Sequence, residues 1–449
     1  GGMAIAGVRR STCKCIPWGP GRDRRGGPRL DGVTESLAAG IIIPEDARLV
    51  REAEATREED PLPMIVTSPR DLAELAATLR RHGVFALDME FERERSYWPR
   101  LQLLQVAVPG LVAAVDPLAL DDLAPLYELI ADPAIEKVTH AGRQDAEIFY
   151  LKTGRPPAAI YDTQIAAALV GLGEQVGYAV LVQRLLGVRV AKHERVTDWG
   201  RRPLSAAQLE YALNDVRHLL QVRDALDADL RELKRETWFR EETGFYSDPE
   251  LYRQDPDRLY MKVSRWRSLD RRGLGVLREL VAWREEEARR RDLPRQRVVP
   301  DDVLVELAGR RPQRVADLAP LRRLHPKEIE RGGEGIVAAV SRGLALPEAQ
   351  LPSPPKPPRE DPDASLAADL LTVALRLRAR EIRIAPSYLG NQKDVLELVN
   401  WLADRRQGAP PHLHAGWRRE VVGEDLAAIY EGRGSLRIDP GQGKVVVEP

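Results

Sequence analysis

Two carboxylates stand two residues apart inside an apolar run of this 449-residue chain. Asp88 and Glu90 lie in segment 84–91, whose β-branched and aromatic residues are typical of a buried strand. Because side chains alternate along a strand, both carboxylates project from one face of the sheet. Like charges held side by side repel, so the pair makes physical sense mainly if a cation binds between them. In a chain with 31% charged residues the spacing also arises by chance, and alone it indicates little.

Three further residues could complete such a site. Tyr211 and Asp215 are four apart in a helical pattern that follows Ser205, a typical helix N-cap, so they share one helical face. Asp145 comes shortly after His140, where a strand pattern gives way to a helix. The ordinary explanations are a packing tyrosine beside a solvated aspartate, and a first-turn aspartate favoured by the helix dipole. Each of these elements is weak evidence by itself.

Taken together, the four carboxylates indicate a metal-dependent hydrolase. They supply the hard oxygen ligands that Mg²⁺ or Mn²⁺ prefers, and few lysines lie near them in sequence. Two such ions ~3.5–4 Å apart activate an attacking water and stabilise the leaving 3′ oxygen of a phosphodiester. The Tyr211 hydroxyl could orient or help deprotonate that water. The expected cofactors are therefore two divalent metal ions, Mg²⁺ or Mn²⁺.

The surrounding patterns predict an α/β unit that positions these groups. Three strands at 84–91, 101–108 and 111–115 form an antiparallel meander, since Pro109 and Gly110 make a turn between the last two. Helices and strands then alternate, with strands predicted at 137–140 and 160–162 and mostly helices from there to about residue 240. A further strand at 64–66 and a helix at 71–81 precede the meander. This order predicts a mixed sheet with helices on its faces.

The sequence resembles a known family, ribonuclease D. This family belongs to the DEDD superfamily of 3′–5′ exonucleases, in the subgroup whose third motif carries tyrosine. The three motifs occupy 87–91, 140–145 and 211–216, and two stretches typical of ribonuclease D itself occupy 161–167 and 198–205. The resemblance covers roughly residues 64–345 and implies a ribonuclease H-like exonuclease fold. It implies Asp88, Glu90, Asp145 and Asp215 as metal ligands and Tyr211 as holder of the nucleophilic water. All five positions are intact, which argues against a dead enzyme.

Substrate contacts can be suggested from residue type. Phe91 could stack on the terminal base, a contact worth ~1–3 kcal/mol per base, or it could be a core residue at the end of a strand. His140 could contact a phosphate or the terminal sugar, or it could be satisfied within the fold. Arg201 and Arg202 could reach backbone phosphates, although solvated arginines are the default.

The rest of the chain predicts helical units on either side of a linker. Residues 269–345 have helical spacing throughout and resemble an HRDC domain, and residues 364–449 are interpreted as a divergent second HRDC-like domain. Residues 241–268 connect the exonuclease domain (61–240) to the first helical unit, and the Pro-rich segment 346–363 is a stiff linker. Residues 261–345 carry 20 Lys and Arg against 13 Asp and Glu, which favours contact with a nucleic-acid backbone, although these could be ordinary surface charges. If both units flank the catalytic one, they could form a ring or clamp for single-stranded 3′ ends.

Composition excludes several other classes. No apolar run approaches the ~20 residues of a membrane span, and residues 1–60 lack the apolar core of a signal peptide and are expected to be a disordered extension. Cys13 and Cys15 are too close in sequence for a disulfide and have no histidine nearby for a zinc site, which indicates a reducing compartment, the cytoplasm. The net charge of −1 says nothing about a partner.

Three functions remain open from the sequence. The first is a metal-dependent 3′–5′ exoribonuclease that trims structured RNA, precursor tRNA being what the family resemblance suggests. The second is a 3′–5′ DNA exonuclease for repair, because metal ligands see only the phosphodiester. The third is a nucleic-acid-binding scaffold without turnover, for which the loss of a ligand would have been the signature.

Overall fold

The computed structural model describes residues 63–190, 198–253, 255–321, 323–353, 361–441 and 444–448. The predicted N-terminal extension, with Cys13 and Cys15, lies outside these ranges. Within them, every helix is too short or too polar to cross a lipid bilayer.

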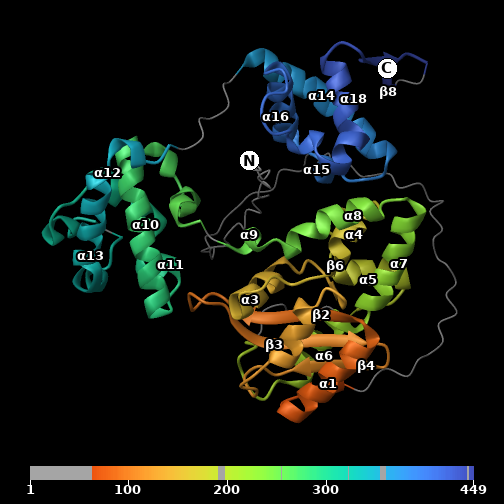
Figure 1. Ribbon diagram of the computed structural model, residues 1–449, viewed down its shortest axis with the longest axis horizontal. Coiled ribbons are helices and arrows are strands. Elements are labelled where there is room, and N and C mark those ends of the chain that lie inside the picture. The colour runs from red at the N-terminus through yellow and green to blue at the C-terminus, as the bar shows by residue number, and fades with distance from the viewer. Residues whose placement is uncertain are drawn as a thin grey trace, which may run out of the picture.

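A six-stranded mixed sheet forms the centre of the first unit (Figure 1). Its strands are β1 (Pro63–Val66), β2 (Val84–Glu92), β3 (Arg100–Val108), β4 (Leu111–Val115), β5 (Glu136–Thr139) and β6 (Ile160–Asp162). They lie in the order β1-β4-β3-β2-β5-β6. Strands β2, β3 and β4 pair antiparallel, β1 pairs parallel with β4, and β5 and β6 extend the sheet in parallel from β2. The predicted meander and mixed sheet are confirmed.

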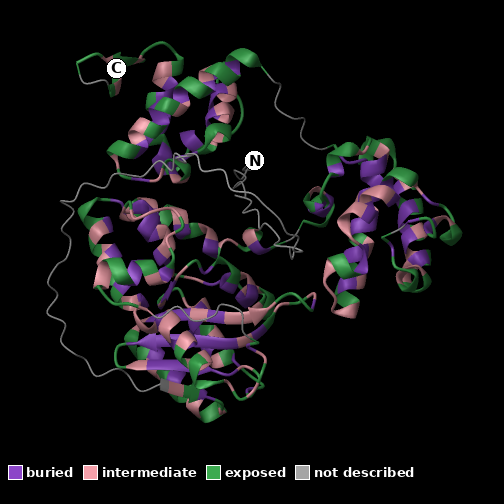
Figure 2. Ribbon diagram, turned by 180° about the vertical axis from the view of Figure 1, so that it is seen from behind, coloured by how far each residue is buried: buried purple, intermediate pink, exposed green. Residues whose placement is uncertain are grey.

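Alternation along β2 gives the sheet two different faces. Phe85, Leu87 and Met89 pack in a core cluster with α1 (Pro69–His82) and α2 (Ala124–Ala131). Ala86 points to the other face, which α6 (Ala206–Arg217) covers. Strand β3 is buried along most of its length, whereas β2 has both buried and partly exposed residues (Figure 2). The remaining helices of this unit are α3 (Arg143–Thr153), α4 (Thr163–Leu169), α5 (Tyr178–Leu186), α7 (Leu219–Glu232) and α8 (Glu236–Thr243).

The segment expected to connect the first two units divides between them. Its first part, η1 (Gly244–Ser247) and α9 (Pro249–Tyr252), packs on α3, where Tyr252 stacks on Tyr150 with ring centroids 4.8 Å apart. Its second part, η2 (Pro256–Lys262) and η3 (Trp266–Ser268), joins the core of the helical unit that follows.

That second unit is a small helical bundle. It consists of α10 (Arg271–Arg291), α11 (Arg295–Val298), α12 (Asp301–Arg310), η4 (Val315–Leu318), α13 (Pro326–Ala345) and η5 (Glu348–Gln350). The tip of the β2–β3 hairpin docks on the C-terminal end of α10. There the backbone N–H groups of Tyr97 and Trp98 donate to Asp292 Oδ1 at 3.0 and 3.3 Å, and Arg100 pairs with the other carboxylate oxygen at 2.7 Å. Within the predicted linker, η5 already packs on this bundle, where Glu348 pairs with Arg271 at 2.8 Å.

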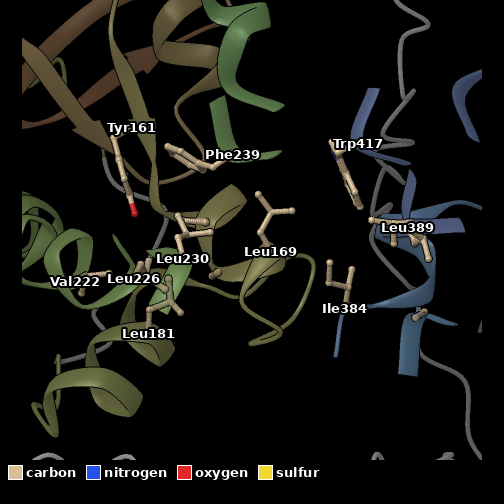
Figure 3. Close-up of a cluster of buried hydrophobic side chains, with 14 of the residues drawn as sticks. Tyr161, Leu169, Leu181, Val222, Leu226, Leu230, Phe239, Ile384, Leu389 and Trp417 are labelled. Carbon is tan, nitrogen blue, oxygen red and sulfur yellow. The ribbon is translucent and has the colours of Figure 1, made fainter. Parts of the chain in front are cut away.

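The third unit packs on a different side of the exonuclease unit. It contains α14 (Pro362–Glu381), α15 (Pro386–Leu389), α16 (Gln392–Ala403), η6 (His412–His414), α17 (Gly416–Arg418), η7 (Arg419–Gly423), α18 (Glu424–Tyr430) and a hairpin of β7 (Ser435–Asp439) and β8 (Lys444–Glu448). One apolar cluster spans both units, and Figure 3 shows Leu169 and Phe239 on one side of it with Ile384 and Trp417 on the other. Arg235 links the two units directly, because it donates to the backbone carbonyls at 169 and 382 at 2.5 and 2.6 Å.

Candidate active site

Strand β2 presents Asp88 and Glu90 on the face that α6 covers. Both side chains are partly buried, and the strand itself is central in the sheet, between β3 and β5. The register of β2 against β3 shifts between Glu90 and Phe91, so the regular alternation ends just after the second carboxylate. Such bulges re-aim side chains near functional sites.

Helix α6 brings the third carboxylate to this strand pair. The helix starts with a capping box, in which Ser205 Oγ accepts from the Gln208 N–H at 3.2 Å and the Gln208 side chain accepts from the Ser205 N–H at 3.0 Å. Ligand oxygens of Asp88, Glu90 and Asp215 all lie within 4.8 Å of one another. Three carboxylates at this separation can share one cation.

Asp145 lies in the first turn of α3 and is buried, with 9% of its surface exposed. It does not belong to the group of three within 4.8 Å, but burial, together with the charges of Asp88 and Glu90, raises its pKa. Ligands of a second ion ~3.5–4 Å from the first need not lie within reach of every ligand of the first. Asp145 lies near enough to Asp88 and Glu90 for their charges to act on it.

Burial and mutual repulsion disfavour the charged form of these carboxyl groups, and a bound cation would stabilise that form. Burial raises the pKa of Asp88 to about 6, and burial together with the charges of Asp88 and Asp215 raises the pKa of Glu90 to about 8. Burial, with repulsion from Asp88, raises the pKa of Asp215 to about 8. Arg93 is the cation whose charge opposes the shift at Asp145, and it acts less strongly than burial.

A buried glutamine adds an independent sign that something is bound here. Gln105 on β3 is directly opposite Asp88 in the antiparallel pair, so the two side chains share a face of the sheet. Gln105 is fully buried, and neither its amide nitrogen nor its amide oxygen has a hydrogen-bond partner among the described residues. A water that completes the shell of a bound ion would satisfy this amide. The residues present therefore fit a divalent metal.

Tyr211 lies one turn before Asp215 on α6, as its spacing predicted. The side chain is partly buried against the core, and its ring lies 6.0 Å from that of Trp199. Trp199 comes from the 198–205 stretch that precedes the helix. This packing holds the phenol ring, while the hydroxyl stands on the same helical face as Asp215.

Two of the predicted substrate contacts have neighbours within the protein. Phe91 packs against the α1–α2 core cluster, and the Arg93 guanidinium lies 5.1 Å from its ring centroid, which favours the structural explanation. His140 Nδ1 lies 2.9 Å from Thr163 Oγ1, and its Nε2 is buried. Burial lowers the pKa of His140, because it disfavours the charged imidazolium, and these neighbours favour a structural role for the ring.

Arg201 and Arg202, which precede the helix that carries the third motif, differ in their exposure and contacts. Arg201 is exposed, as a phosphate contact requires. Arg202 instead forms a two-pronged pair with Asp116 at 2.6 and 2.8 Å and donates to the carbonyls of Trp199 and Gln102 at 2.7 Å. These bonds occupy its guanidinium, so the structure places Arg202 in the fold and removes the reason to expect it at a phosphate. The sequence carried no signal for this pairing, because Asp116 lies 86 residues away.

Comparison with known proteins decides the family. Residues 63–231 match the family described as 3′–5′ exonuclease, and residues 273–340 match the HRDC domain. The chain is 41% identical to ribonuclease D of Granulibacter bethesdensis over 394 residues, which cover 87% of this chain and 98% of that one. It is 42% identical to ribonuclease D of Gluconacetobacter diazotrophicus over 382 residues, which cover 84% and 95%.

The chain belongs to the ribonuclease D family. The crystal structure of Escherichia coli RNase D, described as an exoribonuclease involved in structured RNA processing, superposes with a TM-score of 0.74 and 31% identity, covering 83% of this chain and 99% of that one. As a ribonuclease D homologue, this chain is a 3′–5′ exoribonuclease with an acidic cluster that can bind metal. The predicted fold class is confirmed as a ribonuclease H-like exonuclease domain followed by a helical region with an HRDC domain.

Proposed function

We propose that this chain trims the 3′ ends of structured RNA in the cytoplasm, precursor tRNA among them, by two-metal-ion hydrolysis that releases 5′-mononucleotides. The observation that carries the proposal is the group Asp88, Glu90 and Asp215 with oxygens within 4.8 Å of one another. Two bound divalent ions, Mg²⁺ or Mn²⁺, would activate the attacking water and stabilise the leaving 3′ oxygen.

The position of each side chain suggests its role in metal binding or in orienting the attacking water. Asp88 lies next to Glu90 on β2 and acts electrostatically on both Asp215 and Asp145, so it is the natural ligand to be shared between two ions. Asp145 would help to hold a second ion from α3. The Tyr211 hydroxyl orients the attacking water from the helical face it shares with Asp215. Arg201, whose side chain is exposed, is the best-placed candidate for contact with the terminal nucleotides, whereas Phe91 and His140 have partners within the fold.

The helical units would select single-stranded 3′ ends. The basic HRDC domain docks on the β2–β3 hairpin, which extends from the strand that carries the carboxylates. Residues 364–449, which we propose to be a divergent second HRDC-like domain, dock on α4 and α8. Two such units on different sides of the catalytic one would hold the RNA backbone while acidic ligands hold metal.

The test is a digest of a 3′-extended tRNA precursor by the purified full chain. Mononucleotides should appear from the 3′ end with Mg²⁺ and vanish with EDTA. The Asp88→Asn variant is the matched control, since it keeps the shape of the side chain and removes its charge. Internal cuts, or activity that persists in chelator, would contradict the proposal.

A DNA exonuclease for repair remains the second candidate. The carboxylates contact only the phosphodiester, so discrimination depends on contacts to the 2′-OH. RNA and DNA 3′ tails of one sequence, competed in a single reaction, decide between them. Equal turnover of both would favour the broader nuclease.

A further inference from the structure

The stretch 161–167 is typical of the family, yet the proposed chemistry gives it no part. It covers the end of β6 and the start of α4, beside the turn between β5 and α3. That turn carries His140 and leads into the first turn of α3, where Asp145 lies.

The turn has an unusual backbone and no cap of its own. Ala141 has φ +57°, the left-handed conformation that non-glycine residues seldom adopt. At Gly142, the N-cap position, no side chain caps α3, and a Cβ there would lie 2.6 Å from Thr139 Oγ1. Such a conformation persists only when neighbouring groups determine it.

Asp162, on the adjacent strand, stabilises this backbone conformation through hydrogen bonds. Its Oδ1 accepts from the Ala141 N–H at 3.0 Å and from the Gln164 N–H at 2.8 Å, so one oxygen ties the start of α3 to the start of α4. Its Oδ2 accepts from the Tyr246 hydroxyl at 2.6 Å. The carboxylate is 2% exposed, and these bonds satisfy it inside the protein.

Thr163 holds the same turn at two more points. Its hydroxyl donates to the Thr139 carbonyl at 2.9 Å. Because that hydroxyl has a single hydrogen, it accepts from His140 Nδ1, which lies 2.9 Å away. The Asp162–Thr163 pair thus fixes three consecutive residues of the turn.

Tyr246 extends the support to the segment after α8. It is 1% exposed, and the Tyr252 hydroxyl donates to its carbonyl at 2.7 Å. Tyr252 in turn stacks on Tyr150 of α3. The segment 244–252 therefore packs on the helix that carries Asp145 and bonds to the carboxylate that holds the start of that helix.

We propose that Asp162, held by Tyr246 and assisted by Thr163, is a positioning residue that sets where Asp145 stands relative to Asp88, and so controls binding of the second divalent ion. This inference rests on the proposed function, in which Asp145 is a ligand of that ion. Residues that orient metal ligands typically change metal affinity by 10–100-fold when they are replaced.

The test measures Mn²⁺ binding to the full chain by calorimetry, without RNA. Asp162→Ala, which removes the acceptor, should weaken the weaker of two ions roughly tenfold and leave the tighter ion within about twofold. Asp162→Asn keeps an oxygen for the Ala141 N–H and should restore most of the affinity. In metal-free protein, amide exchange across 140–146 should accelerate in Asp162→Ala. In cleavage assays the Mg²⁺ concentration for half-maximal rate should rise roughly tenfold, while KM for RNA stays within about twofold.

Matched variants separate positioning from general loss of stability. Ser68→Ala removes the N-cap of α1, where Ser68 Oγ accepts from the Asp71 N–H at 3.2 Å, in the same unit but on the other face of the sheet. It should leave Mn²⁺ binding unchanged. If Asp162→Ala does not fold, Tyr246→Phe removes one bond to the same carboxylate and should weaken the second ion by about threefold.

Two results would overturn the inference, and a third concerns the function alone. A folded Asp162→Ala variant that binds both ions as tightly as wild type refutes it, as does a Ser68→Ala variant that weakens binding equally. If Asp88→Asn binds Mn²⁺ and cleaves RNA like wild type, the proposed function itself fails. If Asp88→Asn loses activity as expected while the Asp162 variants bind Mn²⁺ like wild type, the proposed function is supported and only the positioning role of Asp162 is refuted.

Discussion

In the absence of metal, the acidic cluster should make the protein less stable as the pH rises, and Glu90→Gln should remove much of this dependence. Glu90 has its pKa raised to about 8 by burial and by the charges of Asp88 and Asp215. In the unfolded chain the same side chain returns to its ordinary pKa near 4.5. Between these two values the folded state binds a proton that the unfolded state has released. Stability from this group is therefore complete below about pH 4.5 and is lost as the pH rises towards 8.

The size of the effect follows from the same shift. Each pH unit in that window costs about 1.4 kcal/mol per group, so Glu90 alone accounts for about 3 kcal/mol between pH 6 and pH 8. The side chain is partly exposed, and solvent screening with local relaxation reduces this to about 1–2 kcal/mol. A neutral glutamine of the same shape carries no such term and also weakens the repulsion on its neighbours. Bound Mg²⁺ should offset the loss in wild type.

Urea unfolding of wild type and Glu90→Gln at pH 6, 7 and 8, each in EDTA and in Mg²⁺, measures this directly. In EDTA the free energy of unfolding should fall with pH more steeply for wild type than for the variant. Added Mg²⁺ should flatten the wild-type curve and change the variant less. Parallel curves for the two proteins in EDTA, or wild-type stability that rises with pH, would refute the electrostatic reasoning.

Three further predictions concern turnover, substrate contact and the fold. Asp88→Asn should lower kcat by at least about 10³-fold while circular dichroism and the unfolding midpoint stay near wild type, because the charge and not the shape holds the ions; substantial residual activity would argue against a shared ligand. Tyr211→Phe should lower kcat by about 10–100-fold with little change in KM, since the hydroxyl acts on the water, and steady-state kinetics on a 3′-tailed RNA separates the two; a change in KM alone would indicate a substrate contact instead. Arg202→Ala should destabilise the protein by about 2–4 kcal/mol, because Asp116 stays buried without its partner, whereas Arg201→Ala should spare stability and weaken RNA binding mainly at low salt; the reverse pattern in thermal unfolding and filter binding would exchange their assignments.

Much of the secondary structure was predictable because it depends on neighbours in sequence. The apolar run with Asp88 and Glu90 is typical of a buried strand, and β2 occupies those residues. Ser205 was expected as an N-cap, and it closes a capping box at the start of α6. Family motifs marked the same positions, since the chemistry demands particular residue types at fixed spacings.

Other roles could not be inferred from the sequence, because they depend on contacts between distant residues. Arg202 looked like a solvated or phosphate-binding cation, but its partner Asp116 is 86 residues away. Tyr246 fell in what looked like a connector, yet it bonds to Asp162 across 84 residues. The 346–363 segment looked like a uniform linker, whereas its beginning packs on the HRDC domain and its end starts α14.

For this protein, residue types and their local periodicity determined which elements form and which acidic side chains could bind metal. Tertiary structure decided which carboxylates come within coordinating distance, which charges become buried and therefore perturbed, and which side chains hold the others in place. The physical reason is the distance along the chain over which each kind of interaction acts. Alternation, helix periodicity and capping act over a few residues, whereas burial and buried polar contacts depend on where the whole chain folds.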